Sequence, residues 1–287
     1  MFRSRTEESV EQSEAMPGSV PGGSMPPRVC ILTPVKDATP HLDRYFECLL
    51  RLDYPRERLS LGLLESDSTD GTLLQLQSKL SQLQPHFKSA RVWNRNFGFH
   101  LPDGVPRWAP SQQLPRRAAL ARSRNYLASV ALGDADWALW IDVDLVDYPP
   151  DVLNRLLATR KDIVHPHCVK VPGGRSFDWN AWKDQQSLLM HDLRGRGELV
   201  ELDSVGGTML LVRADLHREG LIFPPFPYGR LHPKARRRGG RALGWLARLA
   251  GRLVPGEIET EGFAMMAHDM GVPCWGMPQL EVRHKDA

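Results

Sequence analysis

The stretch DWALWIDVD at residues 136–144 decides the fold, because an apolar run of strand length leads directly into two carboxylates. Alternate residues of an extended segment point the same way, so Asp142 and Asp144 can face one ligand. Two convergent carboxylates suit a hard divalent cation, Mg²⁺ or Mn²⁺, held together with diphosphate oxygens. The other interpretation of this D-x-D tripeptide is a solvated strand end. Its surroundings in the chain favour the cation.

The segments around this stretch alternate between short apolar runs and stretches of helical periodicity. Residues 94–115 have no period and several prolines, and we interpret them as a loop. The expected strands are 28–33, 59–64, 90–93, 136–141, a strand beginning at 162–164, 199–203, 208–212 and 280–282; the expected helices are 41–52, 73–83, 116–131, one opening at 149–150, and 259–270.

This alternation of strands and helices predicts βαβ units and an α/β fold whose central, mostly parallel sheet is flanked by helices. Ligands of such sheets bind outside the carboxyl ends of the strands. Polar clusters occupy three of these ends, at Thr33–Asp37, Glu65–Asp70 and Asp142–Asp144. We therefore expect the three clusters to meet in one site.

Composition narrows the class of protein. Of the 287 residues, 41% are hydrophobic and 25% charged, which excludes a wholly disordered chain, a fibrous repeat and a multi-span membrane protein. The four cysteines form no CxxC pair, so we expect a reduced, cytoplasmic environment. Residues 1–27 lack the apolar run of a signal peptide and predict a disordered tail, with one domain over 28–287.

The net charge of +3 conceals one strongly basic segment at residues 228–254, which has eight Lys and Arg and no acidic residue. On a helix, Arg241, Arg248 and Arg252 fall on one side and leucines on the other, a pattern typical of peripheral contact with an anionic membrane through 234–254. The alternative is that the leucines pack on the domain and the arginines are solvated. Aromatic residues are not interleaved with the charges, so we expect no nucleic-acid binding.

Eight stretches, in order along the chain, carry a resemblance to a known family. They are ILTPVKDATPHLDRYFECLLRLDYP (31–55), LLESDSTDGT (63–72), PRRAALARSRNYL (115–127), WIDVDLVDYPPDVL (140–153), FDWNAW (177–182), LDSVGGTMLLVRADLHREGLIFP (202–224), ETEGFAMMAHDMG (259–271) and VRH (282–284). The chain resembles glycosyltransferase family 62, the fungal Anp1-type mannan-polymerase mannosyltransferases. The resemblance implies a Rossmann-like GT-A fold, Mn²⁺ (or Mg²⁺) and GDP-mannose as the donor.

The resemblance also assigns roles to the metal-binding residues. It implies Asp144 as the main metal ligand, and Asp142 as a residue that supports the ribose and the metal-bound water. His284 matches the C-terminal metal histidine of the family, and an imidazole suits Mn²⁺. Without the family, a lone histidine near a C-terminus would be interpreted as a surface residue.

Five residues are expected to contact the nucleotide. By resemblance, Thr33, Pro34 and Asp37 lie near the nucleoside, whereas Asp67 and Ser68 contact the base or ribose. Capping of the next helix is the alternative role of this last pair.

Arg117 and Arg124 are seven residues apart and share one face of the predicted helix 116–131. We favour Arg124 as the partner of the diphosphate or ribose, because a guanidinium pairs well with phosphate oxygens.

The sequence defines the residues near the acceptor less sharply than those near the nucleotide. We choose Glu261 and Asp203 as the catalytic candidates, although a carboxylate also favours a helix N-terminus and Gly206-Gly207 also suits a turn. His165 and His167 could form a second metal site, contact the acceptor or pack within a strand. The fungal relatives carry an N-terminal membrane anchor, which we do not expect here.

Together these inferences predict a metal-dependent retaining glycosyltransferase that transfers mannose from GDP-mannose to a glycan or lipid-linked acceptor. Two alternatives stay open: a GT-A transferase for another nucleotide sugar, such as a UDP-sugar, and a non-catalytic, membrane-associated scaffold with this fold. An oligomer is compatible with all three.

Overall fold

The computed structural model describes residues 25–106, 109–230, 232–236 and 256–285. Nearly all of the predicted tail 1–27 lies outside this part of the chain. The predicted amphipathic helix of the basic segment also lies outside it, so neither prediction is decided by the structure.

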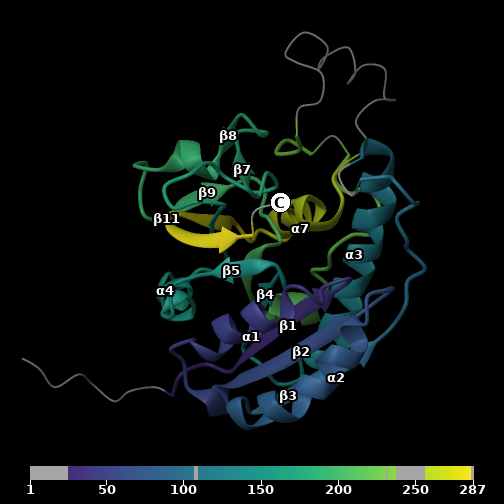
Figure 1. The fold of residues 1–287 in the computed structure, drawn as a ribbon. Helices are drawn as coiled ribbons and strands as arrows, with labels where there is room; N and C mark the ends of the chain where they lie inside the picture. The colour runs from purple at the N-terminus through teal and green to yellow at the C-terminus, as the bar shows by residue number, and fades with distance from the viewer. Residues whose placement is uncertain (1–24, 107–108, 231, 237–255, 286–287) are drawn as a thin grey trace, which may run out of the picture.

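A nine-stranded sheet forms the centre of the described part of the chain (Figure 1). Its order from one edge is β3 (Ser89–Asn94), β2 (Leu59–Glu65), β1 (Val29–Val35), β4 (Trp137–Ile141), β10 (Met209–Arg213), β6 (Ile163–Val169), β11 (Cys274–His284) and β5 (Leu145–Asp147). The ninth strand, β9 (Val200–Leu202), pairs with β11.

The sheet is mixed, with its parallel part built first along the chain. Strands β3, β2, β1 and β4 are parallel neighbours. Strand β10 then runs antiparallel to both β4 and β6, and β11 runs parallel to β6 but antiparallel to β5 and β9. The α/β class with flanking helices is thus confirmed, and the carboxyl ends of β2, β1 and β4 lie side by side as predicted.

Helices cover both faces of the sheet. Alternate residues of β1 enter two separate cores, Ile31 on one face and Leu32 on the other. The first core takes in α1 (Leu42–Leu50), α2 (Thr72–Leu83) and α4 (Val152–Ala158), whereas α3 (Pro110–Ala131), α5 (Ala214–Arg218) and α7 (Glu259–Asp269) belong to the second. Helices α3 and α7 contact each other in this second layer (Figure 1).

The remaining elements are short. They are the hairpin of β7 (Trp182–Lys183) and β8 (Leu188–Leu189) and the 3₁₀ turns η1 (Arg56–Arg58), η2 (Gln84–His86) and η3 (Met190–Leu193). Within the described residues, every helix is too short or too polar to cross a bilayer.

Helix α3 begins at Pro110, within the segment that we predicted to be a loop. Pro115 lies inside it, near its first turns. A proline lacks the N–H that would bond to the carbonyl four residues earlier, and here that residue is the exposed Ser111, whose carbonyl water can satisfy. The prediction was wrong because it took Pro115 as a boundary.

Strand β11 is also much longer than the predicted 280–282. Its pairing with β6 shifts register between Met277 and Glu281, around Pro278. The buried face of the strand alternates regularly, but Gly276 and Pro278 occupy positions on it, and these residue types weaken a strand pattern in sequence. The longer strand matters for function because it carries His284 to the edge occupied by Asp144.

Candidate functional site

The predicted polar clusters meet at one edge of the sheet. Strands β1 and β2 are in register, with Val35 opposite Glu65. Beyond their ends, the backbone N–H of Asp37 donates to Oγ of Ser68 at 2.9 Å, and Oδ1 of Asp37 accepts from the backbone N–H of Thr69 at 2.8 Å. Two of the three clusters are thus directly bonded, as their positions at neighbouring strand ends predicted.

Asp67 organises the loop that follows β3. Its carboxylate accepts the backbone N–H groups of Phe97, at 3.0 Å, and Gly98, at 2.9 Å. Burial raises the pKa of Asp67, but these N–H groups and Lys36 oppose that effect, and the net pKa is lowered. The residue is therefore an ionised anchor for the loop as well as a candidate nucleotide contact.

Thr33 and Pro34 lie in β1, but the hydroxyl of Thr33 is used within the protein. It is fully buried, donates to the carbonyl of Ile141 at 2.7 Å and shares a 2.5 Å hydrogen bond with the hydroxyl of Tyr45. These contacts connect β1 to the end of β4. Thr33 thus supports the strand that leads into the D-x-D motif.

Asp142 is held from two directions. Its backbone N–H donates to the carbonyl of Thr208 at 2.9 Å, and Oδ1 accepts from Nη2 of Arg124 at 3.2 Å. Burial, together with the carboxylates of Asp144 and Asp178, raises the pKa of Asp142 to about 6 against the opposing effect of Arg124. An Asp of this kind gains from a cation that neutralises it.

Asp144 contacts the predicted metal histidine. Its Oδ2 lies 3.0 Å from Nε2 of His284, while Nδ1 of His284 lies 2.8 Å from the carbonyl of Lys285. The His284 ring stacks on Phe177 with centroids 3.7 Å apart. Burial lowers the pKa of His284, but the hydrogen bond to Asp144, the charges of Asp144 and Asp142 and the contact with the Lys285 carbonyl together outweigh this effect, and the pKa is raised.

These side chains are the donors that a manganese site would use. Among the described residues, no three His, Cys, Asp or Glu side chains are gathered as a ready metal cluster, because Asp142 turns to Arg124. Carboxylate oxygens and an imidazole nitrogen nevertheless suit Mn²⁺ chemically. The contact between Asp144 and His284 brings two such donors together at one point, so the residues present fit the ion.

Arg124 is the centre of the buried charge network. Its side chain is only 2% exposed and pairs with Glu259 as well as Asp142. Nη2 also donates to the carbonyl of Gly207 at 3.2 Å, and the guanidinium lies over the Phe223 ring, 5.2 Å from the centroid. Desolvation lowers the pKa of Arg124, and the acidic partners oppose this effect.

Asp178 belongs to the site although we did not select it from the sequence. Its Oδ2 accepts from the backbone N–H of Gly207 at 3.0 Å and the hydroxyl of Thr208 at 3.2 Å. Burial raises its pKa, but His165, 3.6 Å away, and backbone N–H groups lower it to about 2. The sequence feature that could have identified Asp178 is its position in FDWNAW (177–182), one of the stretches that carry the family resemblance.

Gly206 and Gly207 are required by close packing. A Cβ on Gly206 would collide with the carboxylate of Asp178, and one on Gly207 would collide with the guanidinium of Arg124. The groups that approach these two glycines are side chains of the protein, so packing within the chain requires both of them.

Glu261 is fully buried at the start of α7. Its two oxygens accept from Nη1 of Arg117 at 2.7 Å and Nη2 of Arg236 at 2.5 Å, and Trp182 Nε1 lies 3.4 Å away. Glu259, in the same turn, pairs with Arg124. Arg117 and Arg124 thus reach the same turn of α7 from one face of α3, as their spacing predicted.

Asp203 and His167 are engaged elsewhere. Oδ2 of Asp203 accepts from the backbone N–H of Gln185 at 3.1 Å, and Lys234 lies 3.6 Å from Oδ1. The buried His167 lies 3.1 Å from the carbonyl of Pro278 and 3.0 Å from Oγ of Ser176. For His167, these contacts favour the strand-packing alternative.

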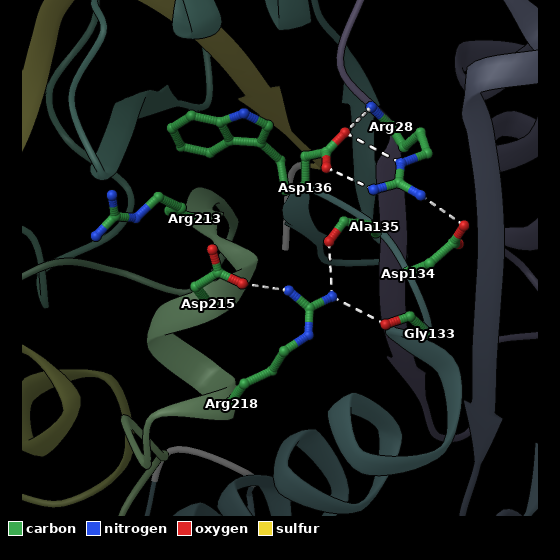
Figure 2. Close-up of a pocket in the computed structure, with 9 residues that line it drawn as sticks. Arg28, Gly133, Asp134, Ala135, Asp136, Arg213, Asp215 and Arg218 are labelled. Atoms are coloured by element: carbon green, nitrogen blue, oxygen red, sulfur yellow. Dashed lines mark hydrogen bonds and ion pairs between the residues drawn. The ribbon is translucent and has the colours of Figure 1, made fainter.

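A cavity of about 410 Å³ lies at the opposite ends of the strands from the predicted site (Figure 2). Its charged side chains neutralise one another: Arg28 bonds to Asp134 at 2.6 Å and to Asp136 at 2.8 Å, and Arg218 bonds to Asp215 at 2.6 Å. Figure 2 shows these pairs around the opening. The cavity lies at the amino ends of β1 and β4 and is separate from the predicted site.

A smaller cavity, of about 120 Å³, touches the predicted site itself. Its lining includes Asp144, Lys285, His41 and Arg44. The predicted metal ligand therefore borders a cavity.

The fold and the charged edge define a class of protein. The sheet with its flanking helices is a GT-A glycosyltransferase fold, and a crystal structure of GalNAc-T7 with UDP, GalNAc and Mn²⁺ matches it with a TM-score of 0.56. The match covers 91% of this chain and 44% of that one, at 13% sequence identity. It concerns the fold alone.

The chain belongs to the Anp1 family, whose profile matches residues 16–193 and 187–227. The mannan polymerase complex subunit mnn9 of Schizosaccharomyces pombe is 29% identical over 89% of this chain and 79% of its own length. The mannan polymerase II complex anp1 subunit of the same organism is 26% identical, and the match covers 90% of this chain but 64% of that protein.

Proposed function

We propose that the chain is a metal-dependent retaining glycosyltransferase that transfers mannose from GDP-mannose to a glycan or lipid-linked acceptor. One observation carries the proposal: the contact of Asp144 with His284, next to the Asp142–Arg124 pair, at the carboxyl end of β4 in a member of the Anp1 family. Clusters of carboxylates and an imidazole with shifted pKa values are typical of functional sites, which supports a catalytic role over that of a scaffold.

In this proposal, Asp144 and His284 hold Mn²⁺ and Asp142 assists. The ion, when bound, offsets the negative charge that builds on the departing diphosphate. Arg124 keeps Asp142 ionised and oriented, because it is itself fixed by Glu259 and by the carbonyl of Gly207. Rigid placement of these charges supplies the electrostatic stabilisation.

The nucleoside is assigned to the ends of β1 and β2. Asp37 and Ser68 are bonded to each other, and Asp67 holds the loop after β3, so this surface is preorganised for a base and ribose. Thr33 and Pro34 support it from β1.

The acceptor side is assigned to the N-terminal turn of α7. Glu261 and Asp203 remain our candidates for the acceptor side. In the structure, the carboxylate of each is paired with basic side chains. Glu261 fixes Arg117 and Arg236, and Asp203 lies beside Lys234. An acceptor would therefore meet arginines and lysines that these carboxylates orient.

Further observations extend the proposal to partners, a membrane and an alternative donor. The names of the relatives describe subunits of mannan polymerase complexes, which supports action within a complex on a mannan-type glycan. The basic segment 234–254 supports contact with an anionic membrane. The alternative donor is a UDP-sugar, in line with the UDP bound in the GalNAc-T7 structure.

Hydrolysis of a panel of nucleotide sugars by the purified chain, with Mn²⁺ or with EDTA, tests the proposal. We expect GDP-mannose to be hydrolysed, Asp144→Asn to lower the rate at least 100-fold, and EDTA to abolish it. Preference for a UDP-sugar would show that the donor is a UDP-sugar and not GDP-mannose. Turnover that is insensitive to EDTA would refute the proposed metal dependence. Absence of hydrolysis with every donor would favour a non-catalytic scaffold.

A matched control separates loss of the site from loss of the fold. Asp134→Asn removes a carboxylate from the ion pairs at the opposite edge of the sheet, where Asp134 bonds to Arg28. This variant should keep the wild-type rate. The membrane contact is tested by flotation with anionic liposomes, which deletion of residues 234–254 should abolish.

A further inference from the structure

Trp179 is an exposed indole beside the buried acids of the site. Its exposed fraction is 66%, whereas Asp178 before it is 8% exposed and Ala181 is fully buried. Among the described residues, its ring has no aromatic or cationic partner. Tryptophan combines a large apolar ring with an N–H donor and is enriched at binding surfaces for that reason.

The backbone that presents Trp179 is rigid. The backbone N–H of Asn180 donates to Oδ1 of Asp178 at 3.0 Å, and Nε2 of Gln186 donates to the carbonyl of Trp179 at 3.3 Å. The amide of Asn180 also reaches Oγ1 of Thr260 at 3.5 Å. A ligand that covers the indole therefore gains contact area without the entropy cost of ordering a loop.

Trp179 is also connected to both sides of the proposed reaction centre. Through Asp178 it adjoins Thr208, whose carbonyl accepts from the backbone N–H of Asp142. Through Asn180 it adjoins the first turn of α7, where Glu259 pairs with Arg124. The segment that carries Trp179 is thus bonded both to α7 and to the turn that holds Asp142.

We propose that Trp179 is the platform on which a pyranose ring of a saccharide acceptor stacks. One face of a pyranose presents C–H groups that pack on an aromatic ring, and the neighbouring Asn180 amide suits the hydroxyl groups at the ring edge. The proposal rests on the proposed glycosyltransferase function, which it deepens by naming an acceptor-binding residue.

Calorimetry with the full chain, saturated with GDP and Mn²⁺, tests this proposal with α-linked mannotriose, maltotriose and methyl α-mannoside as probes. We expect mannotriose to bind the wild type, Trp179→Ala to weaken that binding at least tenfold, and Trp179→Phe to restore part of it. The GDP affinity of Trp179→Ala should stay within twofold of the wild type. Leu74→Ala, which removes an exposed apolar side chain from α2, is the control and should change neither affinity.

Three outcomes would overturn the proposal. These are no binding of any probe by the wild type, equal affinity of Trp179→Ala for mannotriose, and a change in oligomeric state with unchanged mannotriose affinity, which would assign the indole to a protein interface. The test is independent of turnover: a wild type that binds mannotriose through Trp179 but hydrolyses no donor refutes the proposed function and retains the subsite.

Discussion

At the scale of single residues, buried charge decides how this site is held together. Arg124 is almost completely buried and pairs with Glu259 and Asp142. Burying these charges carries a desolvation penalty, so removing one member leaves the others uncompensated. The network therefore behaves as a unit whose geometry depends on every partner.

Arg124→Gln should lower the free energy of unfolding by about 3 kcal/mol, because it removes one of the two guanidinium groups that pair with the buried Glu259 and leaves only Arg117. It also removes the partner of Asp142. It should also weaken GDP binding in the presence of Mn²⁺. Urea denaturation and calorimetry measure the two effects. Arg122→Gln, two residues earlier on the same helix but exposed, should change neither; equal stability of the two variants would contradict the assigned role of Arg124.

His217 should make stability depend on pH. Trp140 Nε1 donates to its Nε2 at 3.1 Å and its Nδ1 lies 2.8 Å from the carbonyl of Leu221, so the neutral ring satisfies both contacts. Burial lowers its pKa to about 4. The folded state then binds fewer protons than the unfolded state, whose pKa is near 6.5, and this contribution is lost as the pH falls from about 6.5 to 4.

Urea denaturation of the wild type and His217→Gln over this pH range checks that sign. The advantage of the wild type should shrink on acidification, by up to about 1.4 kcal/mol per pH unit. His86→Gln, which replaces an exposed histidine, is the control and should leave the slope unchanged. A difference between the wild type and His217→Gln that is constant with pH would contradict the assigned pKa.

At the scale of elements, the turn before β10 connects the two sides of the site. Its glycines let Asp178 and Arg124 approach the backbone directly, and Thr208 then bonds to Asp142. The antiparallel register of β10 on β4, with Met209 opposite Ile141, places this turn beside the D-x-D motif. Asp178 thus holds Thr208, and Thr208 in turn holds the backbone of Asp142.

Gly206→Ala should lower the free energy of unfolding by about 2 kcal/mol or more and reduce GDP affinity, because the new methyl group displaces Asp178. Gly133→Ala is the matched control, because Gly133 lines the cavity at the amino ends of β1 and β4. Its backbone is left-handed, with φ of +49°, but only the carbonyl of Ala131, at 3.9 Å, would lie near the new methyl group, so the change should cost about 1 kcal/mol and leave GDP affinity unchanged. Unchanged GDP affinity in Gly206→Ala would contradict the role of the turn.

At the scale of the whole molecule, the site joins the middle of the described chain to its C-terminal strand. Asp144 follows β4, whereas His284 ends β11, which is paired with β6, β5 and β9. Their contact spans 140 residues of sequence and closes the sheet edge around the predicted metal position. A ligand that contacts both should stabilise the entire fold.

Mn²⁺ with GDP should therefore raise the melting temperature of the wild type by several degrees. At a free ligand concentration 100 times Kd, a ligand specific for the folded state adds about 2.7 kcal/mol. His284→Ala should lose most of this increase, whereas His86→Ala should retain it. Differential scanning calorimetry measures the shift, and an undiminished increase in His284→Ala would remove His284 from the metal site.

Local pattern was sufficient for much of the architecture and for the edge of the sheet at which the polar clusters meet. Apolar periodicity predicted β1, β2, β4 and the helices between them, and the polar residues at the strand ends predicted that their side chains gather at one edge. The same patterns failed at Pro115 in α3 and at Gly276 and Pro278 in β11. Apolar periodicity predicts a helix or strand from neighbouring residues. These residues interrupt the periodicity, although the helix or strand continues through them.

By itself, the sequence determined the α/β class, the edge of the sheet that carries the polar clusters, and the helix face shared by Arg117 and Arg124. Only the tertiary structure decided that Arg124 pairs with Glu259 and that Asp178 holds the turn at Gly207. The reason is physical: strand and helix periods are set by neighbours in the chain. The pairing of buried charges depends on how distant strands align and on which acids lose their water.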